Sequence, residues 1–117
     1  MRQEGFWSDT HRPEDHLDPT WRGPDRSACL RFIRAGTRTH HYKGWAECRI
    51  CGEKLGSSDL ELPGGHYVCP AMFDHYLRKH RLKPSRRFID VAVAWGQVHG
   101  CAEKKVGQHG LCGVQNS

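Results

Sequence analysis

Two cysteines and two histidines at short spacings constrain this chain more than any other feature of its sequence. Cys48 and Cys51 are separated by two residues and followed by Gly52, and His75 and His80 are separated by four. Two thiolates on a tight turn and two imidazoles near a helix end can reach one ion, and structural zinc takes four such ligands in a tetrahedron. We therefore predict one structural zinc ion, bound by Cys48, Cys51, His75 and His80.

The spacing between the two pairs sets this arrangement apart from the common Cys2His2 zinc finger. There are 23 residues between Cys51 and His75, where that finger has about 12. A redox dithiol, which also uses Cys-x2-Cys, and a pair of packed thiols without metal remain alternatives. Four protein ligands leave no open position for a water molecule, so the predicted site is structural and we expect no enzymatic activity from it.

The composition explains why a metal ion is needed. Leu, Ile, Val and Phe together make up 21 of the 117 residues, which is below the roughly 20% typical of chains that bury a sufficient core. A structural zinc ion contributes on the order of 10–16 kcal/mol in finger peptides, compared with a typical folding stability of about 5–15 kcal/mol. We expect one domain, held by zinc as much as by its apolar interior.

The beginning of the chain indicates where the protein resides. It is polar through Asp18 and has no apolar stretch of the length found in secretory signals. We therefore expect a cytoplasmic protein, in which the six cysteines are metal ligands or buried thiols and not disulfides. No apolar run approaches the ~20 residues of a membrane-spanning helix.

The sequence pattern predicts a small α+β domain at residues 23–96. A polar N-terminal arm, 1–22, precedes it. A flexible arm is the favoured interpretation, and docking on the domain through Trp7 and Trp21 is the alternative. The region 97–117 contains four glycines and little apolar periodicity, and we expect it to be a loosely structured tail.

Local signals place helices on both sides of a β-rich stretch. Cys29, Phe32 and Ile33 form an apolar stripe at helical spacing, with Gly36 beyond its end, and predict a helix over 25–35. The elements expected next are a strand over 42–50, a loop over 56–59, a turn over 63–65 and a strand over 66–68.

The second half of the domain is expected to be helical. Pro70 suits the first position of a helix over 71–82, because its missing N–H costs nothing there. Residues 88–95 fit both a helix capped by Ser85 and an alternating strand. We favour the helix, which Gly96 would end.

Four short motifs together resemble a known group of proteins. They are GWAECRICG at 44–52, LGSSDL at 55–60, YVCP at 67–70 and HYLRKH at 75–80. This set resembles small, largely uncharacterised bacterial zinc-finger-like proteins over residues 30–88, and Pro84 and Phe88 fit the trailing positions. Cys69 stands where a Trp is expected, which implies that Cys69 packs and does not bind metal. The resemblance implies a zinc-stabilised ββα-like unit with flanking helices and irregular termini, and no known activity.

Other histidines and cysteines allow further metal chemistry. His40 and His41 could act as base and metal ligand in a small nuclease, but the spacing identifies no Asn or Asp partner, and exposed or structural histidines are the favoured interpretation. A second metal site could use His99, Cys101, His109 and Cys112, and the sequence does not decide whether it forms. Motifs for nucleotide binding and serine hydrolysis are missing.

A basic stretch follows the second histidine pair. Six cations fall within ten residues, namely Arg78, Lys79, Arg81, Lys83, Arg86 and Arg87, in a chain of net charge +5. Such charges either complement a helix C-terminus or face the phosphates of nucleic acid. Counting back from His75 places Val68, Ala71 and Asp74 at base-reading positions, and this set does not suit base recognition.

These observations predict a non-enzymatic zinc-binding interaction module. It would bind the backbone of DNA or RNA through the basic stretch 78–87, with an affinity that falls as salt rises. An adaptor that docks on an acidic protein surface, with tryptophans as anchors, is the main alternative. A small metal-dependent nuclease is less favoured. A monomer is the default expectation.

Overall fold

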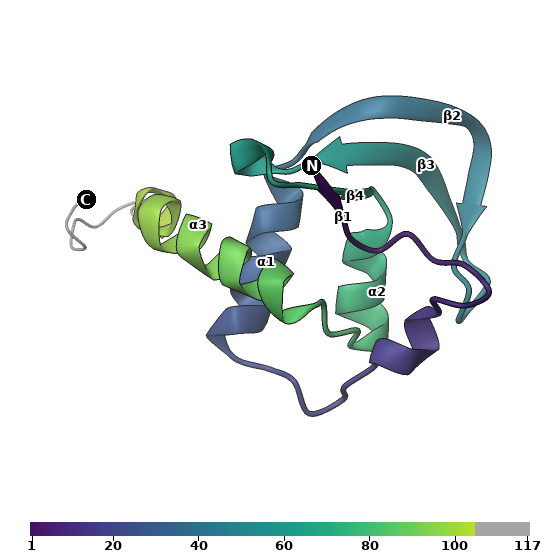
Figure 1. Cartoon of the computed structure of the whole chain (residues 1–117), viewed down its shortest axis with the longest axis horizontal. Helices are drawn as coiled ribbons and strands as arrows, with labels where there is room; N and C mark the ends of the chain where they lie inside the picture. Colours follow the sequence, from purple (N-terminus) through teal and green to yellow (C-terminus); the bar gives the residue numbers. More distant parts are fainter. Residues whose placement is uncertain (105–117) are drawn as a thin grey trace.

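A four-stranded mixed sheet forms one side of the molecule. The computed structural model describes residues 1–104, without the side chains of 41–43 and 99–104. The strand order is β1-β4-β3-β2, with β1 parallel to β4 and the other neighbours antiparallel (Figure 1). The strands are β1 (Arg2–Gln3), β2 (Thr37–Glu47), β3 (Lys54–Glu61) and β4 (Tyr67–Pro70).

Three α-helices lie below this sheet in the view of Figure 1, with α1 and α3 packed together and α2 beside the β2–β3 hairpin. They are α1 (Pro24–Arg34), α2 (Phe73–His80) and α3 (Arg86–Lys104). Two short 3-10 turns, η1 (Pro13–His16) and η2 (Pro63–Gly65), complete the described chain. The predicted α+β class is confirmed.

Helix α3 resolves the ambiguity at residues 88–95 in favour of a helix. Its start is capped as predicted, since the Ser85 hydroxyl accepts a hydrogen bond from the Phe88 N–H at 3.3 Å. The expected stop at Gly96 is wrong, and so is the loose structure expected at residues 97–104, because α3 continues to Lys104. Gly96 faces α1, where an added Cβ would lie 3.9 Å from the Ala28 Cβ. Packing on α1 offsets the roughly 1 kcal/mol cost of an internal glycine.

The rest of the expected tail, 105–117, lies outside the described residues.

Strand β3 runs through residues 56–59, where a loop was predicted. Ser58 is buried, pairs with His41 of β2, and its carbonyl accepts a hydrogen bond from the Ala71 N–H at 2.8 Å. β2 on one side and Ala71 on the other provide pairing partners for the Ser58 backbone. These tertiary contacts outweigh the preference of Gly and Ser for turns. The expected strand 42–50 is shifted for the same reason: its pairing with β3 extends from Thr37 to Glu47.

Pro70 lies at the end of β4 and not at the start of a helix. Successive N–H groups of a strand point to opposite edges, and the Ala71 N–H points to β3. The Pro70 nitrogen therefore points to the β1 side, beyond the hydrogen bond from the Glu4 N–H to the Val68 carbonyl at 3.1 Å, and at this end of the ladder its missing donor is tolerated. Helix α2 begins at Phe73 and ends at His80, within the predicted range 71–82, and Arg81 follows in the left-handed conformation at φ 57°.

The interior is built mainly from aromatic rings. Phe88 lies at its centre, with its ring centroid 5.7 Å from Phe32, 5.1 Å from Tyr67 and 5.7 Å from Phe73, each in an edge-on arrangement. Such pairs contribute about 0.5–1.5 kcal/mol each beyond the area they bury. Aromatic contacts thus stabilise an interior that contains few aliphatic side chains.

The N-terminal segment is docked on the domain, so the favoured interpretation of a flexible arm is wrong and the docked alternative is correct. Trp21 is buried, and the Trp7 ring lies 5.8 Å from Tyr76. The Glu4 carboxylate accepts two hydrogen bonds from Ser85, at 2.8 Å from its N–H and 3.0 Å from its hydroxyl. This segment therefore ties β1 and the start of α3 together.

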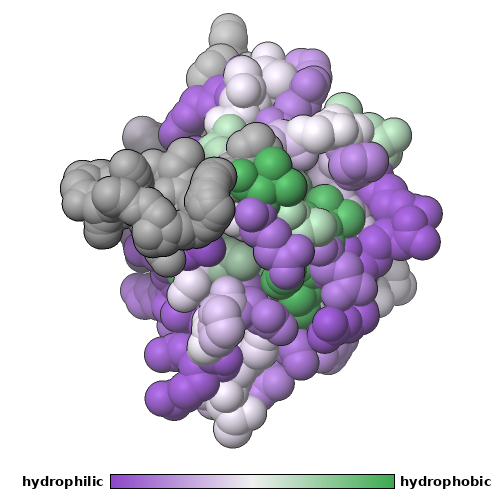
Figure 2. Space-filling view, turned by 90° about the vertical axis from the view of Figure 1, so that its left-hand side faces the viewer, coloured by the Kyte–Doolittle hydropathy of each residue, from purple (hydrophilic) through white to green (hydrophobic). Residues whose placement is uncertain are grey.

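The surface at the end of α3 is mixed in character. Figure 2 shows a small group of hydrophobic residues on this face, surrounded by hydrophilic ones. Val98 on α3 is among the exposed hydrophobic side chains, at 74%. No helix in the described part of the chain is long and apolar enough to cross a bilayer.

The close approach of Gly5 to the core generates a test of the docked segment. Gly5 and Gly23 both have positive φ, but an added Cβ would clash with the Phe73 ring at Gly5 and meet nothing within 4 Å at Gly23. We expect Gly23→Ala to cost about 1–3 kcal/mol, because almost only glycine adopts its φ of 101° with ψ of −165°, and Gly5→Ala to cost about 1–3 kcal/mol more from overpacking. Urea unfolding of the metal-saturated proteins measures both values, and equal losses would contradict docking of this segment.

Candidate metal centre

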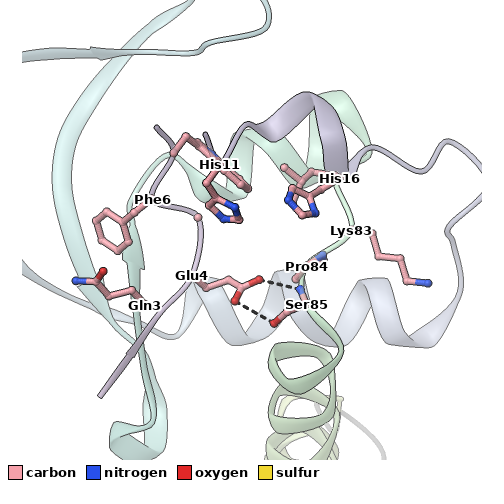
Figure 3. Close-up of a pocket in the computed structure, with 11 residues that line it drawn as sticks. Gln3, Glu4, Phe6, His11, His16, Lys83, Pro84 and Ser85 are labelled. Atoms are coloured by element: carbon pink, nitrogen blue, oxygen red, sulfur yellow. Dashed lines mark hydrogen bonds between the residues drawn. The ribbon is translucent and has the colours of Figure 1, made fainter. Parts of the chain in front are cut away.

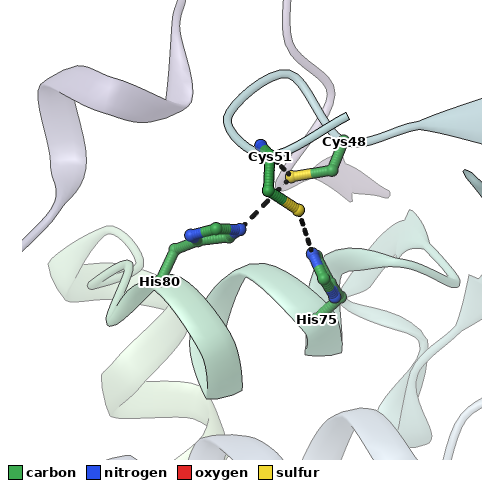
Figure 4. A group of neighbouring side chains, drawn as sticks. All are labelled: Cys48, Cys51, His75 and His80. Atoms are coloured by element: carbon green, nitrogen blue, oxygen red, sulfur yellow. Dashed lines mark hydrogen bonds between the residues drawn. The ribbon is translucent and has the colours of Figure 1, made fainter. Parts of the chain in front are cut away.

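The structure brings together the two cysteines and two histidines that the sequence analysis singles out. Cys48 and Cys51 lie in the turn between β2 and β3, and His75 and His80 point toward this turn from α2 (Figure 4). One ligand atom from each residue lies within 4.8 Å of all the others. The group could therefore hold a metal ion.

Backbone hydrogen bonds shape the turn around the first cysteine. The Cys48 N–H donates to the Glu53 carbonyl and the Gly52 N–H to the Cys48 carbonyl, each at 2.9 Å. Gly52 has a φ of +76°, which favours glycine. The N–H groups of Ile50 and Cys51 point at the Cys48 sulfur, at 3.4 and 3.5 Å. These two hydrogen bonds hold the Cys48 sulfur in place within the turn.

Helix α2 presents its two imidazoles from the middle and the end of the helix. His75 is buried, and His80 is the last helical residue before the left-handed Arg81. Their ring centroids are 5.1 Å apart. The Tyr76 hydroxyl between them accepts a hydrogen bond from the Arg49 N–H at 2.9 Å, and this bond connects the helix directly to the turn.

The distances in the group fit a tetrahedral ion. Bond lengths of about 2.3 Å to sulfur and 2.0–2.1 Å to nitrogen place neighbouring sulfur and nitrogen atoms ~3.6 Å apart in a tetrahedron. The Cys48 sulfur lies 3.4 Å from His80 Nε2, and the Cys51 sulfur lies 3.5 Å from His75 Nε2. All other pairs are within 4.8 Å, so an ion requires movements of about 1 Å or less.

The electrostatics of the site favour neutral imidazoles. Burial lowers the pKa of both His75 and His80 below the ordinary value of 6.5. A neutral ring with Nε2 directed at the sulfurs carries its proton on Nδ1, and His75 Nδ1 lies 3.9 Å from a carboxylate oxygen of Glu53. Carboxylates in this position orient metal-binding histidines in many proteins.

The two other cysteines in the described part of the chain have a different environment. Cys29 and Cys69 are completely buried. Burial raises the pKa of Cys29 to about 12 and that of Cys69 well above its ordinary value, so both remain thiols. Neither belongs to the Cys/His group, and the prediction that Cys69 packs in the core is confirmed.

Of the other histidines and cysteines considered as metal ligands, only His40 has a side chain that the structure describes. His40 is exposed on β2, and its Nδ1 lies 3.6 Å from a carboxylate oxygen of Asp59 on β3, a partner that sequence spacing does not reveal. Within residues whose side chains are described, no second group of three or more ligands is found. The side chains of His41, His99, Cys101, His109 and Cys112 lie outside the described residues.

The basic stretch 78–87 is partly neutralised. Three of its cations contact carboxylates, in the pairs Arg78–Asp74 at 2.6 Å, Lys79–Glu53 at 3.5 Å and Arg86–Asp90 at 2.9 Å. Arg81 instead donates a hydrogen bond to the Trp21 carbonyl at 3.4 Å. The structure also places Arg26 against the end of α2, where it donates to the Leu77 carbonyl at 3.1 Å. Sequence spacing does not associate Arg26 with this stretch, because the two are distant along the chain.

A separate cavity lies between the N-terminal segment and the link from α2 to α3. Its volume is about 340 Å³, and its walls include His11, His16 and Lys83 (Figure 3). The Trp7 ring packs against both histidines, at centroid distances of 4.9 and 5.7 Å. This cavity lacks a third metal ligand close to the two histidines, and we assign no metal to it.

Comparison with known protein families, with curated proteins and with solved structures finds no match to this chain. The likeness to bacterial zinc-finger-like proteins therefore stays an expectation from sequence motifs. We infer the function from the chemistry and geometry of the residues described above.

The ligand set generates a direct prediction. Cys51 is exposed and its loss leaves the core intact, so Cys51→Ser should fold yet release its metal to a competing chelator, because only three ligands remain. Native mass spectrometry of zinc-treated protein should show one ion per wild-type chain and none in the variant.

Cys69→Ala is the matched control for this experiment, since it also removes one thiol and should keep one ion per chain. Loss of metal from Cys69→Ala, or retention by Cys51→Ser, would mean that the ligand set is wrong.

The lowered pKa values of His75 and His80 predict how metal retention depends on pH. Because burial lowers these pKa values, both imidazoles are neutral above pH 6.5 in the folded protein. Protons compete with the metal ion for the imidazole nitrogens only as the pH falls below that value. Zinc release to a chromogenic chelator should be low near pH 7.5 and rise steeply toward about pH 5. The exposed His66→Ala variant should behave like wild type, and a flat release profile would contradict histidine ligation.

Proposed function

We propose that this protein is a non-enzymatic, zinc-organised module that binds the phosphate backbone of nucleic acid. In this proposal, zinc clamps the β2–β3 turn onto α2 and makes these three elements a zinc-finger-like ββα unit. The observation that carries the proposal is the position of the Cys2His2 group: its last ligand, His80, directly precedes a cluster of arginines at the end of α2.

Zinc is the metal that this donor set suits best. Two thiolates and two imidazoles in a tetrahedron are the usual ligands of structural zinc, and four protein ligands complete its coordination. Two thiolates also cancel the charge of a divalent cation, so the loaded domain keeps the net charge of +5. The positive charge of the surface thus remains available to a polyanion.

The turn needs such an ion to stay in place. Four of its residues are exposed, namely Arg49, Cys51, Gly52 and Glu53, and only Cys48 and the half-buried Ile50 pack against the core. The hydrogen bond from Arg49 to Tyr76 contributes only about 1 kcal/mol. Coordination by four ligands supplies the remaining attachment in this proposal.

The arginine cluster, composed of Arg22, Arg26 and Arg81, provides the anion-binding surface. Arg26 donates hydrogen bonds to the Leu77 and Arg78 carbonyls, which fixes it at the end of α2. Burial, followed by the nearby charges of Arg81 and Arg22, lowers the pKa of Arg26. Among the described residues, no carboxylate forms an ion pair with this cluster, so a phosphate would relieve the repulsion between its members.

The basic residues of stretch 78–87 extend this surface in the proposal, with Arg87 and Lys83 adding charge and the carboxylate-paired Arg78, Lys79 and Arg86 contributing less. Backbone recognition of this kind is independent of base sequence and falls with salt.

A salt series with a fluorescein-labelled DNA duplex tests the proposal. Fluorescence anisotropy should show a log affinity that falls linearly with log salt. The double variant Arg22→Gln, Arg81→Gln should bind more weakly and lower the magnitude of the slope by about 2, because about two phosphate contacts are lost.

Arg2→Gln, Arg12→Gln is the matched control, since it removes the same charge from exposed positions in β1 and beside η1. Absence of salt-dependent DNA binding would refute the proposal. Tight binding to polyglutamate in place of DNA would favour the acidic-protein adaptor, and magnesium-dependent nicking of plasmid that is lost in His40→Ala would favour the nuclease.

A further inference from the structure

Trp45 is an exposed tryptophan that the backbone holds away from the core. Its exposed fraction is 71%, although the chain is poor in apolar residues. The β2–β3 register shifts between His41 and Trp45, and Gly44 at φ +83° immediately precedes the indole. The Ser57 hydroxyl donates to the Gly44 carbonyl at 3.3 Å and holds this irregularity in place. Bulges of this kind redirect a side chain, here outward.

The space beside this indole is open. Trp45 pairs with Gly56 on β3, and residues directly opposite one another in an antiparallel pair present their side chains to the same face. A Cβ at Gly56 would meet no atom within 4 Å. The strand thus offers an aromatic ring next to a position without a side chain, where a planar group can lie.

Gly56 also lines a groove between the hairpin and α2. This groove has a volume of about 170 Å³, and its charged lining consists of Arg38 of β2 and the paired Arg78 and Asp74 of α2, beside the candidate metal ligand His75. A neighbouring hollow of about 250 Å³ shares Arg38 with the groove and reaches Arg34. Arg78 is occupied by Asp74, whereas Arg34 and Arg38 are exposed and form no ion pair with any described carboxylate.

We infer that this face binds single-stranded nucleic acid, with one base stacked on Trp45 and the adjoining phosphates contacted by Arg38 and Arg34. The inference rests on the proposed function and adds to it a substrate class and a second contact region. An aromatic platform beside a positively charged groove is the combination by which proteins hold single strands without reading their sequence.

A single strand fits this face better than a duplex does. In a duplex both faces of each base are already stacked, so an isolated indole on the protein surface gains nothing from it. An unstacked base can cover the exposed indole and gain stacking energy, while the arginines compensate the phosphate charge. The platform also directly precedes the metal-binding turn at Cys48, so the ion that holds this turn on α2 would fix the platform.

The test compares labelled oligothymidylate of about ten nucleotides with an abasic oligonucleotide of equal length, which has the same phosphates and no bases. With zinc-loaded wild type at fixed salt, fluorescence anisotropy should show about tenfold tighter binding of the base-bearing strand. Trp45→Ala should weaken the binding of the base-bearing strand alone, so that the two affinities become similar. Trp45→Phe should retain most of the difference in affinity. Val98→Ala, which shortens another exposed apolar side chain, should behave like wild type.

Each outcome separates the two proposals. If wild type binds both strands equally, backbone binding stands and the stacking inference fails. An unchanged preference in Trp45→Ala also overturns the inference. If neither strand binds, the proposed function itself fails. If polyglutamate displaces the strand from wild type, and Trp45→Ala weakens the binding of polyglutamate, this face is a site for an acidic peptide. That result would overturn its assignment to nucleic acid.

Discussion

The attachment of the β2–β3 turn to helix α2 is the contact on which the functional surfaces depend. Each element supplies only half of a ligand set, and neither can complete a tetrahedron alone. Apart from the four candidate ligands, the turn contacts the helix through the hydrogen bond from the Arg49 N–H to the Tyr76 hydroxyl and through the ion pair of Glu53 with Lys79. Metal coordination would therefore decide whether the hairpin and the helix behave as one rigid unit.

The rest of the domain is stabilised in a different way. Phe88 and its aromatic neighbours form an interior between the sheet and the helices, and the N-terminal segment closes one side of it with Gly5 and Trp7. Glu4 joins that segment to the cap of α3. Apolar packing thus holds α1, α3 and the sheet, while the candidate metal centre joins α2 to the β2–β3 turn.

The two candidate contact regions both border this same helix. At its C-terminal end, Arg26 comes from α1 and meets Arg81; along its flank, the groove joins it to the strand that carries Trp45. In this proposal one ion positions both regions, because the turn and the helix end share its ligands. Loss of the ion would then weaken both contacts together.

Much of the site and of the helical structure could be predicted from the sequence, because it depends on spacing over a few residues. The Cys-x2-Cys turn, the histidine pair, the apolar stripe of α1 and the Ser85 cap are all local patterns. They constrain the backbone wherever it lies in the fold.

Tertiary structure alone decided the features that need a distant partner. Ser58 lies in a strand because β2 and Ala71 satisfy its backbone, and α3 passes through Gly96 because α1 covers it. The pairing of His40 with Asp59 and of Arg26 with the end of α2 also joins residues far apart in the chain. Local propensities differ by about 1 kcal/mol or less, and contacts of this kind readily outweigh them.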